Sequence, residues 1–528
     1  MTEKKSVFGR CIGWFSELFG QRKYQGAVTD RFTGDWQPRS TSGDVEIKQS
    51  LTELRNRSRQ LIRDNPYAAN AQSIVVDNVV GNGIRMQANV VNEDGSANDA
   101  LNDQIETAWL KWCEKDNCEV SGRLSMTGIL RVAMGGVFSD GEFLIRAVRK
   151  PFGQSKIPFA LELIEPDYLV NNDSQVDVGR GNLCRMGVEV DQWQRPQAYW
   201  LYKNHPGDLF YSGWSSAEYS RVKAEDIFHL YMVNRWPQTR GVPWLHAVMR
   251  RMRDLQTYND SEVTAARMSA NVVGFITNET GLGWGADIEN KGPAASRFFR
   301  EGSLLDRAGT LLRLFPGEGF SGFSPQRPNT SLDPFMRYMI REVAAGVGVS
   351  YEALSRDYSQ SNYSSSRLSL LDDRSRWRVI QGWIISSYLT PIYRKWLDMA
   401  VLSGEIQIPD YFRNKDRYQA VRFMPRGWSW VDPTKEVQAY ALAVQNGFTT
   451  LTDVLAENGS GTDLEDFIST KVRERDLLAA AGLKFPVTGT KNTLTSKQSE
   501  TKDSDSDDDV KDSEGKEDKD DDKGDKDA

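Results

Sequence analysis

The sequence GVGVSYEALSRDYSQSNYSSSR, residues 346–367, lies between two apolar helical patterns and decides how the rest of the chain is interpreted. It contains no Lys and no His, and its formal charges cancel, being confined to Glu352, Arg356, Asp357 and Arg367. Ser, Asn and Gly compete with regular structure, so the composition predicts a mobile loop over residues 359–366. A surface connector is the simplest interpretation of such a loop, and any other must come from the remainder of the chain.

The charge of the chain is unevenly distributed. Residues 500–528 contain 15 acidic and 6 basic residues, a local net charge of −9, whereas the whole chain of 528 residues carries −7. Subtracting −9 from −7 leaves about +2 for residues 1–499. A body of this charge does not suit tight binding of nucleic acid, which requires many uncompensated Lys and Arg side chains. The 4 cysteines fit a reducing compartment without a disulfide framework.

Apolar periodicity divides the first half of the chain into helices followed by strands. Helical spacing runs over residues 45–62, and Asn65 and Pro66 then provide the N-cap and first position of another helix. Further helices and strands are predicted at residues 100–113, 127–138, 142–148, 159–164, 186–190, 198–202 and 227–231. The patterns therefore predict an α+β domain over residues 45–240, preceded by a flexible arm over residues 1–44.

Helical patterns dominate the second half. Within a stem segment at 241–271, the helical pattern from Pro243 to Asn271 would be roughly 43 Å long at about 1.5 Å per residue, longer than one small domain needs. Charges of both signs surround much of its girth, which is typical of a strut or a subunit-facing element. The remaining patterns predict a compact α/β insertion at 272–331, a helix at 332–345, a long helix with a kink at Pro391 within 368–425, helices within 426–487 and a disordered acidic tail at 488–528.

Residues that catalysis or metal binding would require are scarce. The chain has 3 histidines and no GxxxxGK[ST], HExxH or GxSxG motif. The GxGxxG sequence at 317–322 is followed by Pro325 and Pro328, which exclude the helix that would hold a pyrophosphate, so we interpret it as a Gly-rich turn. Cys113 and Cys118 have no second pair or nearby His to complete a metal site. We therefore expect no catalytic residue, no metal, no cofactor and no membrane span.

The order of these parts, together with several short motifs, resembles the lambda family of tailed-bacteriophage portal proteins. The motifs are DNPYAAN at 64–70 with VVGNG at 79–83, QTRG at 238–241, AAGVGVSYEALSR at 344–356 followed by YS at 363–364, and KEVQ at 435–438. Each motif is short, but their order and spacing across residues 50–480 are specific. The arm and the acidic tail lie outside the resemblance.

The resemblance implies a non-enzymatic homododecameric ring at one capsid vertex, through which double-stranded DNA is packaged and later ejected. It implies a portal-type subunit with a wing at 45–240, stem helices at 241–271 and 332–345, a clip at 272–331, a tunnel loop at 346–367, a long helix returning to the wing at 368–425 and a crown at 426–487. The implied partners are the terminase large subunit, the major capsid and scaffold proteins, and head-completion or connector proteins. The implied location is the virion, after assembly in the host cytoplasm.

Three groups of residues are candidates for these contacts. The loop residues expected to contact DNA are Arg356, Tyr358, Ser359, Gln360, Asn362, Tyr363 and Arg367. The stem residues expected to contact neighbouring subunits, chosen for their mixed charge, are Arg250, Arg253, Asp254, Asp260, Glu262 and Arg267. The clip residues expected to dock terminase or head-completion proteins are Asn278, Trp284, Arg297, Phe298 and Arg300.

The neutral loop composition suits a channel because DNA in transit has to be centred without being held. Every neutralised phosphate adds affinity, and a ring multiplies that affinity by its number of subunits. We therefore hypothesise that residues 346–367 contact DNA weakly. The alternatives are another structural protein of the phage head and, less favoured, a DNA-processing enzyme, against which the missing P-loop and the missing carboxylate cluster argue.

Overall fold

The computed structural model describes residues 40–171, 178–179, 181–208, 218–271, 274–278, 318–322, 331–428, 433–457 and 464–482. The chain divides into two compact units, Met1–Leu464 and Glu465–Ala528. In the second unit the described structure consists mainly of the helix α16 (Leu464–Ala480). Most of the predicted arm, most of the predicted insertion and the acidic tail lie outside the described residues.

The helices of the first half begin close to where their capping residues predict. Asn65 accepts hydrogen bonds from the backbone N–H groups of Tyr67 and Ala68 at 3.0 and 3.2 Å, and Pro66 opens the helix, where a missing N–H loses no partner. The arm is shorter than predicted, because the first described helix begins at Gly43 rather than after residue 44. The helices are α2 (Gly43–Asp64), α3 (Pro66–Val79), α4 (Asp99–Trp112) and α5 (Met126–Asp140).

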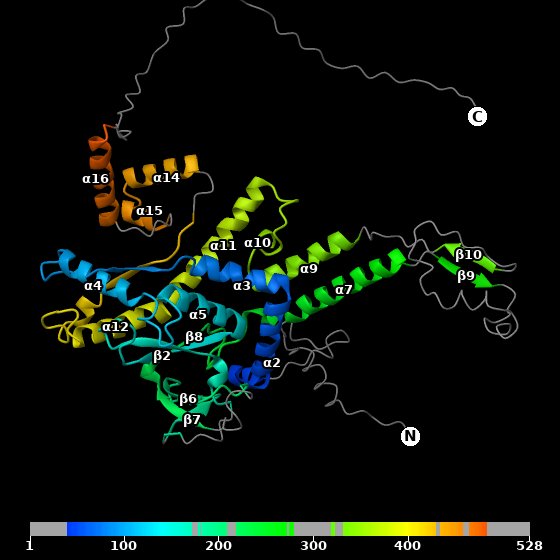
Figure 1. The fold of residues 1–528 in the computed structure, drawn as a ribbon, viewed down its shortest axis with the longest axis horizontal. Coiled ribbons are helices and arrows are strands. Elements are labelled where there is room, and N and C mark those ends of the chain that lie inside the picture. The colour runs from blue at the N-terminus through cyan, green and yellow to red at the C-terminus, as the bar shows by residue number, and fades with distance from the viewer. Residues whose placement is uncertain are drawn as a thin grey trace, which may run out of the picture. The chain divides into compact units, whose positions relative to one another are not determined.

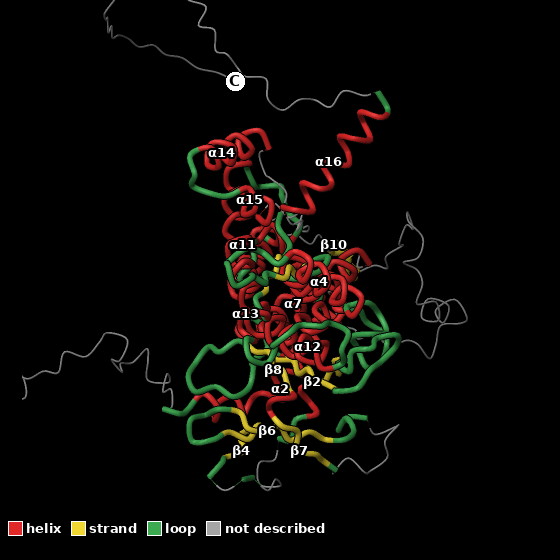
Figure 2. Tube along the Cα trace, turned by 90° about the vertical axis from the view of Figure 1, so that its left-hand side faces the viewer, coloured by secondary structure: helices red, strands yellow, loops and turns green. Residues whose placement is uncertain are grey.

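Strands β2 to β8 form two antiparallel sheets in this α+β unit, with orders β3–β2–β8 and β4–β5–β6–β7. Figures 1 and 2 place the second sheet on the side of β2 and β8 away from α12. A small core of Leu144, Val188, Tyr199, Leu201 and Ile227 joins the two sheets. The predicted strands are confirmed, whereas β1, β4 and β7 were not predicted. The bounds are β1 (Arg85–Ala88), β2 (Glu142–Val148), β3 (Ala160–Ile164), β4 (Leu183–Arg185), β5 (Val188–Val190), β6 (Pro196–Tyr202), β7 (Tyr219–Lys223) and β8 (Ile227–Tyr231), with 3₁₀ turns η2 (Pro166–Tyr168) and η4 (Ala224–Asp226).

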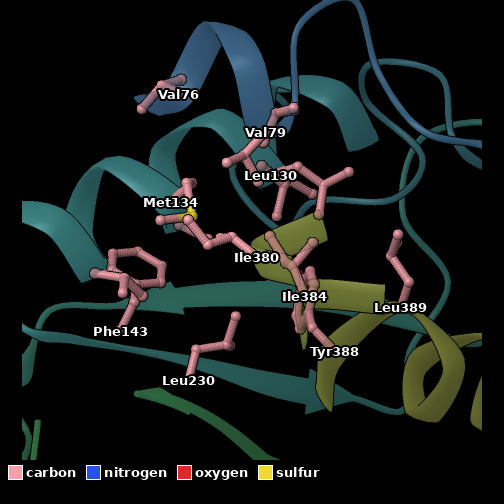
Figure 3. Packing of buried hydrophobic residues seen from close by; sticks show 14 of the residues in the cluster. Val76, Val79, Leu130, Met134, Phe143, Leu230, Ile380, Ile384, Tyr388 and Leu389 are labelled. Atoms are coloured by element: carbon pink, nitrogen blue, oxygen red, sulfur yellow. The ribbon is translucent and has the colours of Figure 1, made fainter. Parts of the chain in front are cut away.

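The main hydrophobic core unites segments that lie far apart in the sequence. Figure 3 shows Val76 and Val79 of α3 and Met134 of α5 packed with Ile384 and Tyr388, which come from the last third of the chain. Beside them, the rings of Trp109 and Trp112 on α4 pack against Trp396 and Tyr393, with Trp109 and Trp396 centroids 5.0 Å apart. The wing-like first half is therefore completed only by helices from residues 363–402.

A buried ionic cluster organises the junction between the first sheet and the segment that follows it. Glu142, the first residue of β2, and Arg240 are both fully buried, and Arg240 Nη2 lies 2.6 Å from Glu142 Oε1. His229 Nε2 and the Gly241 N–H lie 3.0 and 2.9 Å from the other carboxylate oxygen, and Arg55 of α2 lies 3.2 Å from Oε1. Burial opposes ionisation of Glu142, but the charge of Arg240 and the hydrogen bond from His229 outweigh it, and the pKa of the carboxyl falls below its ordinary value. We call these five residues the Glu142 cluster.

Further contacts tie α2 to the same junction. Arg55 also pairs with Asp167 at 2.8 Å. Asp44, at the start of α2, accepts hydrogen bonds from the N–H and the hydroxyl of Thr239, both at 2.8 Å, and pairs with Arg185 at 2.8 Å. The QTRG motif is therefore a structural joint between α2, the two sheets and the stem that follows.

The stem segment is shorter than the sequence predicts. A 3₁₀ turn, η5 (Trp244–Ala247), precedes α7 (Met249–Asn271), whose 23 residues span roughly 35 Å at 1.5 Å per residue. A Cβ on Gly241 would lie 2.1 Å from the carbonyl oxygen of Gly141, so the backbone passes too closely there for a side chain. The predicted helix over 241–271 was wrong at its start, because the chain bends at this close contact before α7 begins.

The strands of the insertion pair with each other. β9 (Gly274–Asn278) and β10 (Glu318–Gly322) form an antiparallel pair, with Glu318 opposite Asn278. The GxGxxG sequence therefore lies in a strand, and its interpretation as a turn was wrong. The predicted helix near 296–299 and strand at 310–314 lie outside the described residues.

The second half of the first unit is helical and closes the core. α9 (Leu332–Val347) extends beyond the predicted end at 345 and packs on α7, with the rings of Tyr258 and Phe335 4.9 Å apart and Arg251 paired to Glu342 at 3.0 Å. The predicted long helix contains a π-helical turn, η6 (Ile385–Leu389), which ends two residues before Pro391, whose missing N–H cannot continue the α-helical ladder. The remaining elements are α10 (Tyr351–Ser355), α11 (Tyr363–Ile384), η6 (Ile385–Leu389), α12 (Thr390–Leu402), α13 (Lys415–Tyr418), β11 (Val421–Met424), which pairs with β1, and α14 (Pro433–Gln445) and α15 (Leu451–Glu457).

Within the part of the chain that the structure describes, every helix is too short or too polar to cross a bilayer.

Replacing Glu142 by Gln should destabilise the first unit by about 3–5 kcal/mol, because Arg240 would remain buried without its carboxylate. Urea unfolding followed by tryptophan fluorescence measures the change. Glu162→Gln is the matched control, since Glu162 is 41% exposed and its pair with Arg146 at 3.5 Å contributes about 0–1 kcal/mol. Equal effects of the two substitutions would contradict the central role of the Glu142 cluster.

Candidate functional site

The loop predicted at the centre of the sequence is much shorter in the structure. Helix α9 continues to Val347, α10 occupies Tyr351–Ser355, and α11 begins at Tyr363. The Asn362 side-chain oxygen accepts a hydrogen bond from the Ser365 N–H at 2.8 Å. In turn, the Ser365 hydroxyl oxygen accepts one from the Asn362 N–H at 3.3 Å. This capping box makes residues 363–366 the first turn of a helix, so the loop prediction was wrong there. We call residues 356–362, which remain non-helical, the connecting loop.

Asp357 shapes the first part of the connecting loop. Its carboxylate accepts from the Ser359 N–H at 3.0 Å and the Tyr351 hydroxyl at 2.9 Å, and Arg337 of α9 lies 3.7 Å away. The hydrogen bonds from the Ser359 hydroxyl and N–H, followed by that from Tyr351, lower the pKa of Asp357 to about 2. Asp357 is therefore ionised at any physiological pH, and its nearest cation is Arg337, which Asp357 shares with Asp333 of α9 at 3.0 Å.

Contacts at both ends hold α10 in place. At its start, Asp373 of α11 accepts from the Ser350 N–H at 3.1 Å and the Ser350 hydroxyl at 2.7 Å. At its end, the Asn70 side-chain amide donates to the carbonyl oxygens of Ala353 and Leu354 at 3.1 and 2.8 Å. These carbonyls belong to the last turn of the helix, where no intrahelical N–H is available. The DNPYAAN and SYEALSR motifs are thus parts of one contact, which places the connecting loop.

The predicted DNA-contacting residues differ in how freely they are presented. Ser359, Gln360 and Asn362 are exposed, and the large side chains of Tyr358 and Tyr363 are 58% and 61% exposed.

The two predicted arginines of this group have structural contacts. Arg356 ends α10 in the left-handed region, with φ 59°, and its guanidinium lies 3.3 Å from the Asn70 side-chain oxygen. Arg367 is partly buried and lies 3.6 Å from Glu436 of α14. Arg367 therefore serves a contact between helices in the structure, whereas the tyrosines and amides present the freer surface.

Four of the predicted stem residues line one groove. The groove has a volume of about 450 Å³ and lies between α2 and α7, with Arg250, Arg253, Asp254 and Asp260 on the α7 side. Those four side chains are exposed and form no ion pair among the described residues. Arg267 is also exposed, and Glu262 is half-buried.

Only one predicted clip residue can be placed. Asn278 ends β9, and the other clip candidates, Trp284, Arg297, Phe298 and Arg300, lie outside the described residues.

One group of side chains has the spacing of a cation site. Glu165, Asp167 and His205 offer ligand atoms within 4.8 Å of one another. Asp167 is already paired with Arg55 and Arg59, whose positive charges oppose cation binding.

The predicted structural role of the cysteine pair agrees with the surroundings of Cys118. This side chain is buried, and its sulfur lies 3.5 Å from the Glu114 carbonyl oxygen.

The sequence interpretation missed the residues that position the loop. Asn70, Arg337 and Asp373 contact the α10 segment from three different helices. The only available signal was that Asn70 closes the DNPYAAN motif.

Comparison with known proteins decides the family. Residues 29–381 match the model described as "Phage portal protein, lambda family". The chain belongs to the lambda family of phage portal proteins. It is 30% identical over 447 residues to the probable portal protein of Halomonas phage phiHAP-1, covering 84% of each chain. It is 23% identical over 506 residues to portal protein B of Escherichia phage lambda, covering 89% of this chain and 92% of that one. As a member of this family, the chain is a structural protein that forms a DNA channel in the phage particle.

Solved structures from gene transfer agent particles are also similar in part. A chain of the native particle's virion aligns with a TM-score of 0.41 and 14% identity, covering 85% of this chain and 99% of that chain. A chain from the neck of the empty particle aligns with a TM-score of 0.44 and 14% identity, covering 80% and 96%.

Replacing Asn70 by Ala should loosen α10, because two carbonyl oxygens lose their donor, at a cost of about 1–3 kcal/mol. Hydrogen exchange measured by mass spectrometry should show faster exchange in residues 350–358 of this portal-family chain. Asn446→Ala is the control, because the exposed Asn446 amide follows α14 directly and donates to the Leu442 carbonyl oxygen of that helix, away from α10. Unchanged exchange in Asn70→Ala would mean that Asn70 does not position the segment.

Proposed function

We propose that this chain forms a closed homododecameric ring at one capsid vertex, through which double-stranded DNA is packaged and later ejected. The observation that carries the proposal is the family match, which extends from residue 29 to residue 381 and so includes the α+β body, α7, α9 and the connecting loop. The ring acts as a passive conduit without a catalytic site. Its location is the virion, after assembly in the host cytoplasm.

The connecting loop is the proposed site of DNA contact. Of the exposed side chains here, Tyr358, Ser359, Gln360 and Asn362 of the loop and Tyr363 at the start of α11 are hydroxylic, amide or aromatic. The exposed formal charge is that of Arg356, whose guanidinium is held 3.3 Å from the Asn70 side-chain oxygen. Asp357 is only partly exposed and lies 3.7 Å from Arg337, which also pairs with Asp333 at 3.0 Å. A lining of this kind offers weak hydrogen bonds and stacking surfaces to a duplex without neutralising its phosphates, so DNA can slide past it.

The other predicted contacts complete the proposed assembly. Neighbouring subunits meet along the stem, where the unpaired charges of the α2–α7 groove include both signs and therefore suit a head-to-tail contact. The clip, at residues 272–331, docks the terminase large subunit during packaging and head-completion or connector proteins afterwards. The major capsid and scaffold proteins surround the ring during capsid assembly.

Electron microscopy of the purified full-length chain tests the ring directly. We expect closed rings of twelve-fold symmetry with a central hole wide enough for a DNA duplex. Monomers, open filaments or rings without such a hole would contradict the proposal and favour another structural role in the phage head.

Replacing Gln360 by Lys should slow DNA packaging at low salt, because each subunit would add one phosphate-binding charge to the channel. The effect should shrink as salt screens the added charges. Gln360→Glu is the matched control, since Gln360 is exposed and either substitution leaves the fold unchanged. The measurement is the packaging rate of rings supplied with the cognate terminase and ATP. Equal rates for the Lys and Glu variants at low salt would argue against DNA contact at this loop.

A further inference from the structure

Helix α11 has two apolar faces, and only one of them is covered. The inner face packs into the main core through Asp373, Trp377, Ile380, Gln381 and Ile384, all buried. The outer face is exposed along its whole length, at a spacing of three or four residues, through Ser364, Leu368, Leu371, Ser375, Val379 and Gly382. Leu368 and Val379 are 71% and 72% exposed, and Leu371 is 45% exposed. Three exposed aliphatic side chains alternating with small residues along one helix face, which we call the stripe, are typical of a protein contact surface.

Gly382 supplies a second and independent observation. Glycine inside a helix costs about 1 kcal/mol relative to alanine, so it needs a reason. At Gly136 of α5 the reason is internal, because a Cβ there would lie 2.4 Å from the Phe143 ring. A Cβ on Gly382 would meet nothing within 4 Å. Within the described part of the chain nothing requires glycine at this position, which favours close approach by another backbone.

The charges beside the outer face of α11 are mainly positive. Arg376 and Arg378 border the stripe on its two sides, are exposed, and form no ion pair within the described structure. Asp372 also borders it, which leaves a net positive charge. The guanidinium groups of Arg376 and Arg378 contact the rings of Trp244 and Trp428 at 5.8 and 5.9 Å, and Arg376 also donates to the Val347 carbonyl oxygen at 3.3 Å, so their positions are set without an ion pair within the described structure.

Another helix of the same chain carries the complementary surface. The outer face of α4 presents Asp99, Asp103, Thr107 and Leu110, with Leu110 65% exposed. Neither aspartate forms an ion pair among the described residues. Helices α4 and α11 lie apart in the first unit (Figure 1), so one cannot cover the other within a subunit.

We propose that the outer face of α11 packs against the outer face of α4 in a second copy of this chain. The proposal rests on the ring proposed above and names one of its contact surfaces. Leu110 packs among the exposed leucines and valine of α11, Gly382 and Ser375 let the neighbouring helix approach closely, and Arg376 and Arg378 pair with Asp99 and Asp103. Because the two faces differ, the contact is head-to-tail and repeats around a ring instead of stopping at a dimer.

Single substitutions on the exposed stripe test the contact. Val379→Asp and Gly382→Leu should each lower the fraction of full-length chain in rings by about tenfold or more at fixed concentration, measured by mass photometry. Gly382→Leu raises helix propensity, so lost assembly in that variant cannot come from a weakened helix. Leu402→Asp, at a 62% exposed leucine of α12, is the control and should assemble normally. Far-UV circular dichroism of the subunits checks that all variants keep their helix content.

Charge exchange identifies the partner surface. Arg378→Glu and Asp103→Arg should each weaken assembly, and the two together should restore it, because the pair is then present in the opposite sense. If the double variant forms no more rings than the single variant that assembles less well, α4 is excluded as the partner. If Val379→Asp and Gly382→Leu form rings as the unsubstituted chain does, the exposed stripe is not a subunit contact although the ring stands. If the unsubstituted chain forms no ring, the proposed function fails instead.

Discussion

The buried pairing of Glu142 with Arg240 is the interaction on which the first unit depends. The two charges lie 2.6 Å apart with neither exposed, and desolvation of such groups is costly unless every remaining polar atom finds a partner. His229, Arg55 and the Gly241 N–H provide those partners. They come from a strand, a helix and the entry to the stem, so the carboxylate can be satisfied only when these elements have assembled. The cluster thus fixes the direction in which the stem leaves the sheets.

The connecting loop is positioned by the same principle at smaller scale. Helix α10 is too short to be stable alone, and its ends are completed by Asn70 of α3 and Asp373 of α11. Helices α3 and α11 also pack in the main core. The position of the loop is therefore fixed relative to the body of the subunit and not only relative to α7 and α9. These contacts hold the backbone of the loop in place, and the small and hydroxyl-bearing side chains around Ser359 project from it. In the proposed channel, such a loop would have flexible side chains on a backbone whose position is the same in every subunit.

Assembly and DNA transit place opposite demands on the surface. A ring needs strong contacts between neighbouring chains, which favour apolar area and matched charges. A passage for DNA needs weak contacts that do not neutralise the DNA phosphates with positive charge. In this chain the two proposed surfaces meet on α11. Its first residue, Tyr363, belongs to the proposed passage, and the apolar stripe that begins one residue later faces away from the core.

The sequence by itself determined most of the helices and strands, their order and the resemblance to the family. Periodicity and caps such as Asn65–Pro66 act over a few residues, and the family motifs are likewise local, so both can be read without coordinates. Only the tertiary structure decided which residues that are distant in sequence form ion pairs and hydrogen bonds with one another. Residues 363–366 look like a loop by composition but become helix because Asn362 and Ser365 cap each other and α11 is buried along its inner face. Glu142 and Arg240, like Asn70 and the end of α10, are separated by most of a domain in sequence. Their pairing depends on long-range packing, which no local pattern encodes.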